Sequence, residues 1–307
     1  MTNIEPPSRY SIATKGMGRA TIRRLAPMLL VGAGIVLCCV AIPTQTHAAT
    51  SSTWRLTWSD EFNEPNGSSP DPAKWSFETG GNGHGNNELE SYTNRPANVE
   101  QRDGSLIIAA RKEDFTGKDG IARQYTSGRI VTKGHFSQAY GRFEARIKLP
   151  LGKGIWPAFW LLGDNIDSAK WPGCGEIDIF ENIGEPRVIY STLHGPGYSG
   201  AHGISAKFLL PQGEAVDTAF HVYAVEWAPN DIKFFFDNHL IAHRTPADLP
   251  VGAKWVYDHP FFILLNVAVG GNWPGNPDAT TVFPQKMLVD YVRVYTRDEK
   301  TEGRASQ

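Results

Sequence analysis

The fold is decided by the stretch Arg142-Phe143-Glu144-Ala145-Arg146-Ile147-Lys148-Leu149, in which polar and apolar residues alternate without interruption. A period of two places the apolar side chains on one face of a β-strand and the polar ones on the other. Alternation recurs at 106–110 and 291–295, and glycine, proline and asparagine cluster at 80–87 and 270–277. Many short strands separated by turns predict an all-β protein, a β-sandwich of the jelly-roll type.

The bulk properties of the chain exclude some classes of partner. The chain has 307 residues and a formal net charge of −2, so we expect no general affinity for polyanions and no nucleic-acid partner. A single β-sandwich domain often reaches about 250 residues, and a chain of this length can bury a large core. Nine tryptophans have two interpretations, which are core filling and flat ligand-stacking surfaces near loops.

The N-terminal segment has the organisation of a targeting sequence. Three arginines within 19–24 precede an apolar run at 25–42, and small residues follow at 46–49. This order predicts a signal peptide over 1–49 and a protein secreted to the periplasm or the exterior, with no membrane contact after cleavage. The alternative is an uncleaved anchor, because about 18 apolar residues just span a bilayer.

We expect one folded domain over 50–297, followed by a polar tail at 298–307. After cleavage of the leader, Cys174 is the one cysteine left, which excludes an intramolecular disulfide. A thiol nucleophile needs a paired base, and the sequence implies none, so Cys174 is interpreted as structural.

Gly175-Glu176-Ile177-Asp178-Ile179-Phe180-Glu181-Asn182 carries three carboxylates on an otherwise apolar strand. In a regular strand Glu181 would share the face of Ile177 and Ile179, where burial of an unpaired carboxylate is costly. One extra residue at Ile179-Phe180, a β-bulge, returns Glu181 to the face of Glu176 and Asp178. The segment therefore predicts a bulge beside an active site.

Two glutamates on one face, about 13 Å apart along the strand, can bring their carboxyl groups to the separation of about 5–5.5 Å found in retaining glycosidases. Asp178 would lie between Glu176 and Glu181, where its charge helps to keep a neighbouring acid protonated. Two alternatives stay open. The three acids could lie on a solvated strand face, or they could form a carboxylate site for calcium or magnesium.

Tryptophans flank this strand in the sequence. Trp156, Trp160 and Trp171 precede it, and Trp273 lies in a glycine-rich loop. Aromatic rings near paired carboxylates favour sugar subsites, because the flat C–H faces of pyranoses pack on them; core packing is the alternative. His194 follows one hairpin after the strand and is either a contact to the leaving side of the substrate or a polar strand residue.

Several further motifs accompany this strand and are similar, in order, to those of one family. They are Asn86-Asn87-Glu88-Leu89, Tyr125-Thr126-Ser127-Gly128-Arg129, Tyr140–Arg146, Trp156-Pro157-Ala158-Phe159-Trp160, Trp171–Glu176, Asn266–Pro274 and Asp290–Tyr295. With the Glu-x-Asp-x-x-Glu pattern, the chain from Trp54 to about Tyr295 resembles glycoside hydrolase family 16, in its laminarinase-like group.

The resemblance implies a concanavalin A-like jelly roll with a concave substrate cleft. It also implies retaining endo-hydrolysis of β-1,3-glucan, or in addition of mixed β-1,3/1,4-glucan. Glu176 would be the nucleophile, Glu181 the acid/base and Asp178 the assistant, while Asn87 and Arg129 would bind sugar hydroxyls on the non-reducing side.

No cofactor is required for this chemistry, but family members often carry a structural calcium. The matching positions are Glu61, Gly104 and Asp290, which would supply oxygen ligands. We expect a monomer whose partner is the β-glucan substrate.

Other functions remain open on the same fold. They are hydrolysis of a galactan such as agar, transglycosylation, and non-catalytic recognition of β-glucan. Members of the last class usually lose the catalytic acids, and this chain retains all three.

Overall fold

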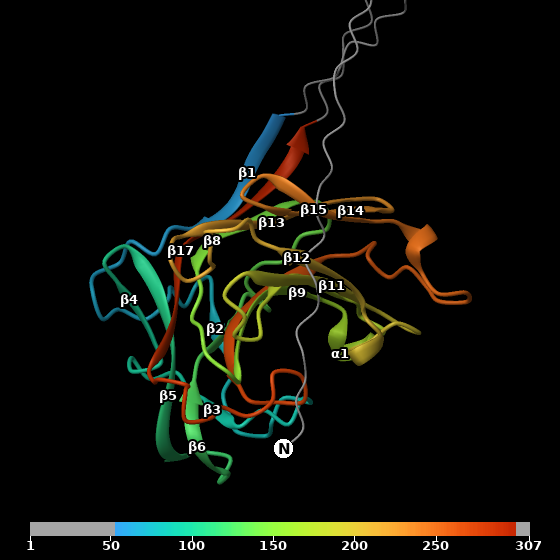
Figure 1. Ribbon diagram of the computed structural model, residues 1–307. Coiled ribbons are helices and arrows are strands. Elements are labelled where there is room, and N and C mark those ends of the chain that lie inside the picture. The colour runs from blue at the N-terminus through green and yellow to red at the C-terminus, as the bar shows by residue number, and fades with distance from the viewer. Residues whose placement is uncertain (1–52, 299–307) are drawn as a thin grey trace, which may run out of the picture. The chain divides into compact units, whose positions relative to one another are not determined.

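A computed structural model describes residues 53–298, which form two β-sheets packed face to face (Figure 1). One hydrophobic core, with residues from both sheets, fills the space between them. Helical segments in the described residues are short: α1 (Ile166–Ala169) and the 3₁₀ turns η1 (Gly200–His202) and η2 (Pro246–Asp248). The predicted β-sandwich is confirmed.

The larger sheet has ten strands in the order β15-β14-β13-β8-β17-β5-β6-β3, with β1 paired to β17 and β4 paired to β5. Its strands are β1 (Thr53–Asp60), β3 (Glu90–Tyr92), β4 (Val99–Arg102), β5 (Ser105–Thr116), β6 (Ala122–Ser127), β8 (Gly141–Lys148), β13 (His221–Ala228), β14 (Asp231–Phe236), β15 (His239–Arg244) and β17 (Gln285–Asp298).

The smaller sheet has seven strands in the order β12-β11-β10-β9-β16-β7-β2. Its strands are β2 (Ser76–Phe77), β7 (Arg129–Val131), β9 (Ile155–Gly163), β10 (Glu176–Glu181), β11 (Val188–His194), β12 (Ile204–Leu209) and β16 (Phe261–Val269). The pairings of β10 with β9 and β11, and of β16 with β9, are antiparallel.

The alternating stretch that predicts the fold is β8. Its apolar residues Phe143, Ala145 and Ile147 are fully buried in the sandwich core. Its polar face differs from expectation, because Arg142 and Glu144 are also buried. They are covered because Arg142 pairs with Glu144 at 2.8 Å and with Glu226 of β13 at 3.0 Å. At this end of the outer face of the sheet, the charged groups of Arg142 and Glu144 are therefore paired with one another and with Glu226 rather than with bulk water.

Strand β16 is buried along its whole length, and its two faces have different surroundings. Alternate residues from Phe261 to Val269 enter the sandwich core. The residues between them lie on the opposite face of the smaller sheet, where Phe262 and Leu264 join a second small cluster with Cys174. We call this opposite face, on β9, β10, β11 and β16, the catalytic face.

Among residues 53–298, no helix is long and apolar enough to cross a membrane. The predicted signal peptide at 1–49 lies outside the described residues.

Candidate active site

The acidic strand β10 contains the predicted bulge. Asp178 lies opposite Trp160 of β9 and Phe180 lies opposite the adjacent Phe159, so Ile179 is the extra residue. The register with β11 shifts at the same place. Ile179 and Phe180 consequently both enter the sandwich core, and the alternation restarts with Glu181 on the catalytic face. The bulge is confirmed, and its cause is that it keeps a carboxylate out of the apolar core.

The three carboxylates therefore lie in a row along one face. Glu176 and Glu181 lie opposite Leu162 and Ala158, four residues apart on β9, which corresponds to about 13 Å between their Cα atoms. Asp178 lies between them and is 2% exposed. Long glutamate side chains on either side can reach toward one another above it.

Two indole groups hold the outer carboxylates in place. Trp171 Nε1–H donates a hydrogen bond to Glu176 Oε2 at 2.7 Å, and Trp156 Nε1–H donates one to Glu181 Oε1 at 3.0 Å. Each glutamate thus has one oxygen engaged and one oxygen left for chemistry. Trp156 and Trp171 were predicted as sugar-binding residues, and the structure places both beside the acids.

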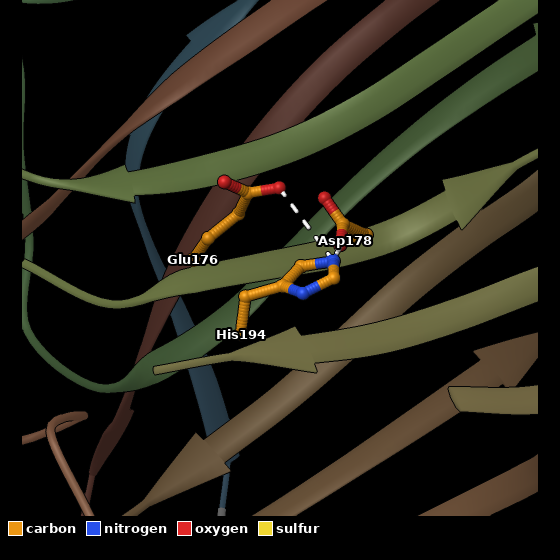
Figure 2. Close-up of side chains that lie close together, drawn as sticks. All are labelled: Glu176, Asp178 and His194. Carbon is orange, nitrogen blue, oxygen red and sulfur yellow. Dashed lines mark ion pairs between the residues drawn. The ribbon is translucent and has the colours of Figure 1, made fainter. Parts of the chain in front are cut away.

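His194 lies against the other side of the cluster. Its Nε2 atom is 3.2 Å from Asp178 Oδ2 and 3.9 Å from Glu176 Oε1 (Figure 2). His194 reaches this position because β11 pairs with β10 in a register that sets it directly opposite Glu176. The imidazole therefore contacts two of the three acids.

Burial and mutual repulsion determine the ionisation of these acids. Burial, and after it the charge of Asp178, raises the pKa of Glu176 to about 8. Burial also raises the pKa of Asp178 to about 7. The pKa of Glu181 is raised well above its usual value by burial and then by the charges of Asp178 and Glu176. Because each ionisation hinders the next, the three groups hold fewer than three negative charges near neutral pH.

Glu176, Asp178 and His194 also have the spacing of a metal site. One ligand atom from each lies within 4.8 Å of the others, and this is the acidic triad that the described residues offer to a cation. Glu176 in this group is also one of the two carboxylates predicted for glycosidase chemistry, which requires no metal.

Exposed aromatic rings continue the site beyond the acids. Trp171 is 47% and Trp273 is 41% exposed. The ring of Trp273 stands edge-on to Trp156, with centroids 5.7 Å apart, and to Tyr190, with centroids 4.9 Å apart. Tyr190 lies opposite Glu181 on β11, and the sequence analysis did not identify it. The available signal was strand alternation, because Tyr190 lies two residues before Thr192 and four before His194 and so shares their face of β11.

Trp160 and Arg129 belong to a second group on this face. Arg129 lies over the ring of Trp160, 4.9 Å from its centroid, and pairs with Glu78 at 2.5 Å. Trp160 Nε1–H donates to Asn266 Oδ1 at 2.8 Å. Both predicted residues therefore lie on the catalytic face, where Glu78 pairs with Arg129 and Asn266 accepts a hydrogen bond from Trp160. Asn266 begins one of the motifs quoted above but was given no role, because a single amide in the apolar run of β16 does not indicate what it contacts.

Asn87 lies in the loop at 83–89. Its backbone φ is 56°, and its side-chain amide donates to Asn272 Oδ1 at 2.9 Å. This bond joins the loop to the glycine-rich segment that precedes Trp273. The predicted residues Asn87 and Trp273 are thus carried by two loops that contact one another.

The residues predicted for calcium lie on the larger sheet. The registers of β1 and β5 on β17 bring Glu61, Gly104 and Asp290 to the same stretch of β17. A register shift between β17 and β8 occurs at Asp290 and disturbs the ladder there. The carboxylate of Asp290 pairs with Arg146 at 2.6 Å, and that of Glu61 pairs with Arg293 at 2.8 Å. Carbonyl and carboxylate oxygens are the ligand types that calcium takes, and both carboxylates here are engaged by arginines.

Comparison with known proteins places the chain among enzymes that act on β-glucans. The model of glycosyl hydrolases family 16 matches residues 86–293. A β-glucanase from Rhodothermus marinus is 43% identical over 257 residues, covering 79% of this chain and 85% of that protein.

A glucan endo-1,3-beta-glucosidase A1 from Niallia circulans is 37% identical and covers 83% of this chain, which spans 40% of that longer protein. Among solved structures, an endo-β-1,3-glucanase from Pyrococcus furiosus is 48% identical with a TM-score of 0.77, covering 80% of this chain and 95% of the other. The family match covers the acidic strand and the segments that carry Asn87 and Trp273, and the sandwich is similar to that of the Pyrococcus furiosus enzyme, so the chain belongs to glycosyl hydrolases family 16.

Proposed function

We propose that this protein is a retaining endo-β-1,3-glucanase that cleaves laminarin-type chains by double displacement. The observation that carries the proposal is the bulge of β10, which sets Glu176, Asp178 and Glu181 in one row on the catalytic face. The exposed rings of Trp171 and Trp273 beside the acids suit a long polysaccharide chain, because internal sugar units can reach the acids from solvent. The resemblance of the whole domain to endo-β-1,3-glucanases supports the same substrate.

The roles are those that the family pattern implies for the two glutamates. Glu181, whose pKa is raised well above its usual value by burial, gives a proton to the glycosidic oxygen, while Glu176 attacks the anomeric carbon and forms a glycosyl-enzyme. Glu181 then removes a proton from water, which releases the sugar with retained configuration. Asp178 contacts Glu176 and His194 and adjusts the charge of the row.

Removal of each glutamate tests these roles, because the two failures differ. Glu176→Ala forms no glycosyl-enzyme and is expected to be inactive on every substrate. Glu181→Ala lacks the acid but still attacks an activated aryl β-glycoside, whose leaving group needs no proton, and azide then intercepts the intermediate as a β-glycosyl azide. Azide rescue of Glu176→Ala to the retained product, with none for Glu181→Ala, would reverse the assignment.

Product analysis on laminarin, lichenan and agarose tests the substrate. We expect internal cleavage of laminarin into a series of oligosaccharides. Cleavage of lichenan as well would extend the specificity to mixed linkages, and products longer than the substrate would indicate transglycosylation. Cleavage of agarose without laminarin, or binding of laminarin without cleavage, would contradict the proposed function.

We further propose a structural calcium at Glu61, Gly104 and Asp290. Calcium bound by the native state alone stabilises it, so chelation is expected to lower the melting temperature and added calcium to restore it. Asp290→Ala is the matched variant and is expected to abolish the response to calcium. An identical melting curve with chelator and with calcium would contradict this site.

Export is proposed from the leader at 1–49. The mature protein is expected in the periplasm or the medium as a monomer. N-terminal sequencing and a mass measurement in solution check both statements, and an intact leader on membrane-bound protein would contradict them.

A further inference from the structure

A second pair of acids lies buried beside the catalytic face, outside the row already described. Glu88 is 4% and Glu90 0% exposed. Glu90 begins β3, and Glu88 lies two residues before it and bridges to Gly270. Two buried carboxylates with like charge are strongly unfavourable unless a proton or a cation compensates them.

No cation is among the described groups that shift the pKa of Glu90. The charge of Arg129 acts to lower the pKa values of Tyr92 and His84. Its guanidinium is bound to Glu78 Oε2 at 2.5 Å. His84 packs edge-on against Tyr92 at 4.7 Å, and its pKa is lowered by burial and then by Arg129, so its ring is neutral at pH 7.

The hydrogen bonds identify which acid carries a proton. Both oxygens of Glu88 already accept, one from the hydroxyl of Tyr92 at 2.9 Å and one from the amide of Asn86 at 3.3 Å. Glu90 Oε2 accepts from the backbone N–H of Val269 at 2.6 Å. Glu90 Oε1 is buried and has no hydrogen-bond partner, while the neighbouring carboxyl group of Glu88 raises the pKa of Glu90. A carboxyl–carboxylate contact becomes a hydrogen bond only when one partner is protonated.

This pair supports both loops that carry predicted sugar contacts. Leu89 N–H donates to Val269 O at 2.8 Å, and Asn272 N–H donates to Asn86 O at 2.9 Å. The loop with Asn87 is thereby fixed to the segment before Trp273.

The pair also connects to the floor of the catalytic face. Tyr92 Oη, which donates to Glu88, accepts from Asn266 Nδ2 at 3.1 Å. Asn266 in turn accepts from Trp160, the residue that lies opposite Asp178. A continuous set of hydrogen bonds thus runs from the buried acids to the strand next to the catalytic row.

We propose that Glu90 is a positioning residue: protonated Glu90 donates a hydrogen bond to ionised Glu88, and this shared proton holds the loop at 83–89 against Val269–Asn272 in the geometry that binds glucan. The inference rests on the proposed function, since glucan is the ligand whose subsite the two loops form. Loss of the proton places two negative charges in one buried site and separates the loops, so substrate binding weakens while the row on β10 is untouched. Burial, and then the charge of Glu88, raises the pKa of Glu90 well above its usual value, which favours the protonated form of this carboxyl group.

Two isosteric variants give opposite expectations. In Glu90→Gln the amide nitrogen donates to Glu88 and the amide oxygen accepts from Val269, so the variant reproduces the protonated acid at every pH. In Glu88→Gln an amide nitrogen replaces one of the two oxygens that accept from Tyr92 and Asn86, so one of these buried hydrogen bonds is lost. We expect the KM for laminarin to rise about tenfold in Glu88→Gln, the effect of one unsatisfied buried group, and to stay within about twofold of wild type in Glu90→Gln.

The pH dependence of KM and an infrared measurement complete the test. Wild-type KM is expected to rise above neutral pH as the pair ionises, and Glu90→Gln to abolish that rise. The infrared difference spectrum between wild type and Glu90→Gln at neutral pH should contain the carbonyl band of a buried protonated carboxylic acid. Absence of this band, or an equal rise of KM in both glutamine variants, would overturn the proposal. The band requires no substrate, so a wild type inactive on laminarin would refute the proposed function and leave this test intact.

Discussion

Glu176→Gln is expected to abolish catalysis and to stabilise the protein at neutral pH. The pKa of Glu176 is raised in the folded state from 4.5 to about 8, first by burial and then by Asp178. The folded state therefore binds a proton that the unfolded state releases between these values. The contribution of Glu176 to stability is fully present below pH 4.5 and is lost as pH rises toward 8. Glutamine has nearly the same shape, keeps an acceptor for Trp171 and has no charge to desolvate.

The size of the effect follows from the width of that pH range. Each pH unit between 4.5 and 7 costs the folded state about 1.4 kcal/mol, which gives an upper value of about 3 kcal/mol at pH 7. Ionisation of Asp178 is coupled to that of Glu176, which reduces this value. We therefore expect Glu176→Gln to raise the free energy of unfolding at pH 7 by about 1–3 kcal/mol. A domain of this size gains about 2–4 °C in melting temperature per kcal/mol, so the expected increase is about 2–12 °C.

Thermal unfolding of wild type and variant between pH 4 and pH 8 measures the effect. The two melting temperatures should converge near pH 4 and separate as pH rises. Glu100→Gln is the control, because the hydrogen bond from Arg102 lowers the pKa of Glu100 and that variant should gain nothing. A Glu176→Gln protein that is no more stable than wild type at pH 7, or whose advantage is the same at pH 4, would refute the reasoning.

Three further predictions concern single contacts. Trp171→Phe removes the N–H that stabilises ionised Glu176, so the acidic limb of the pH profile of kcat/KM should move to higher pH; an unmoved limb would contradict this. The hydrogen bond to Asp237 raises the pKa of His221, so its stabilisation is full below the usual histidine pKa of about 6.5 and is lost as pH rises further; Asp237→Asn should flatten that part of the melting profile. Burial raises the pKa of Cys174 to about 11, so native protein should resist alkylation that modifies the denatured chain, as mass spectrometry would show.

Local patterns were sufficient for much of the architecture. The alternation around Phe143 predicted β8. Asp237-Asn238, a pair typical of hairpin turns, forms the turn between β14 and β15, where both residues have positive φ. The bulge at Ile179 was predictable because a buried, unpaired carboxylate is unfavourable in any fold. These inferences succeed because each depends on the side chains of one strand or one turn.

Pairings between distant segments were not readable in the same way. Arg142 and Glu144 look like a solvated strand face, but Glu226, more than 80 residues away, helps to bury them. Tyr190 gained its place beside Trp273 only from the register of β11 on β10.

The sequence by itself determined that the chain is a β-sandwich with a bulged acidic strand, and it identified the three acids of that strand. Only the tertiary structure decided that Glu88 and Glu90 are buried together and that Glu90 Oε1 lacks a donor. In the sequence Glu88 and Glu90 belong to a loop and a short strand that give no sign of burial. Burial depends on Val269 and Asn266, which lie some 180 residues further along the chain. The physical reason is that strand alternation is a local property, whereas the desolvation of a charge depends on every segment packed around it.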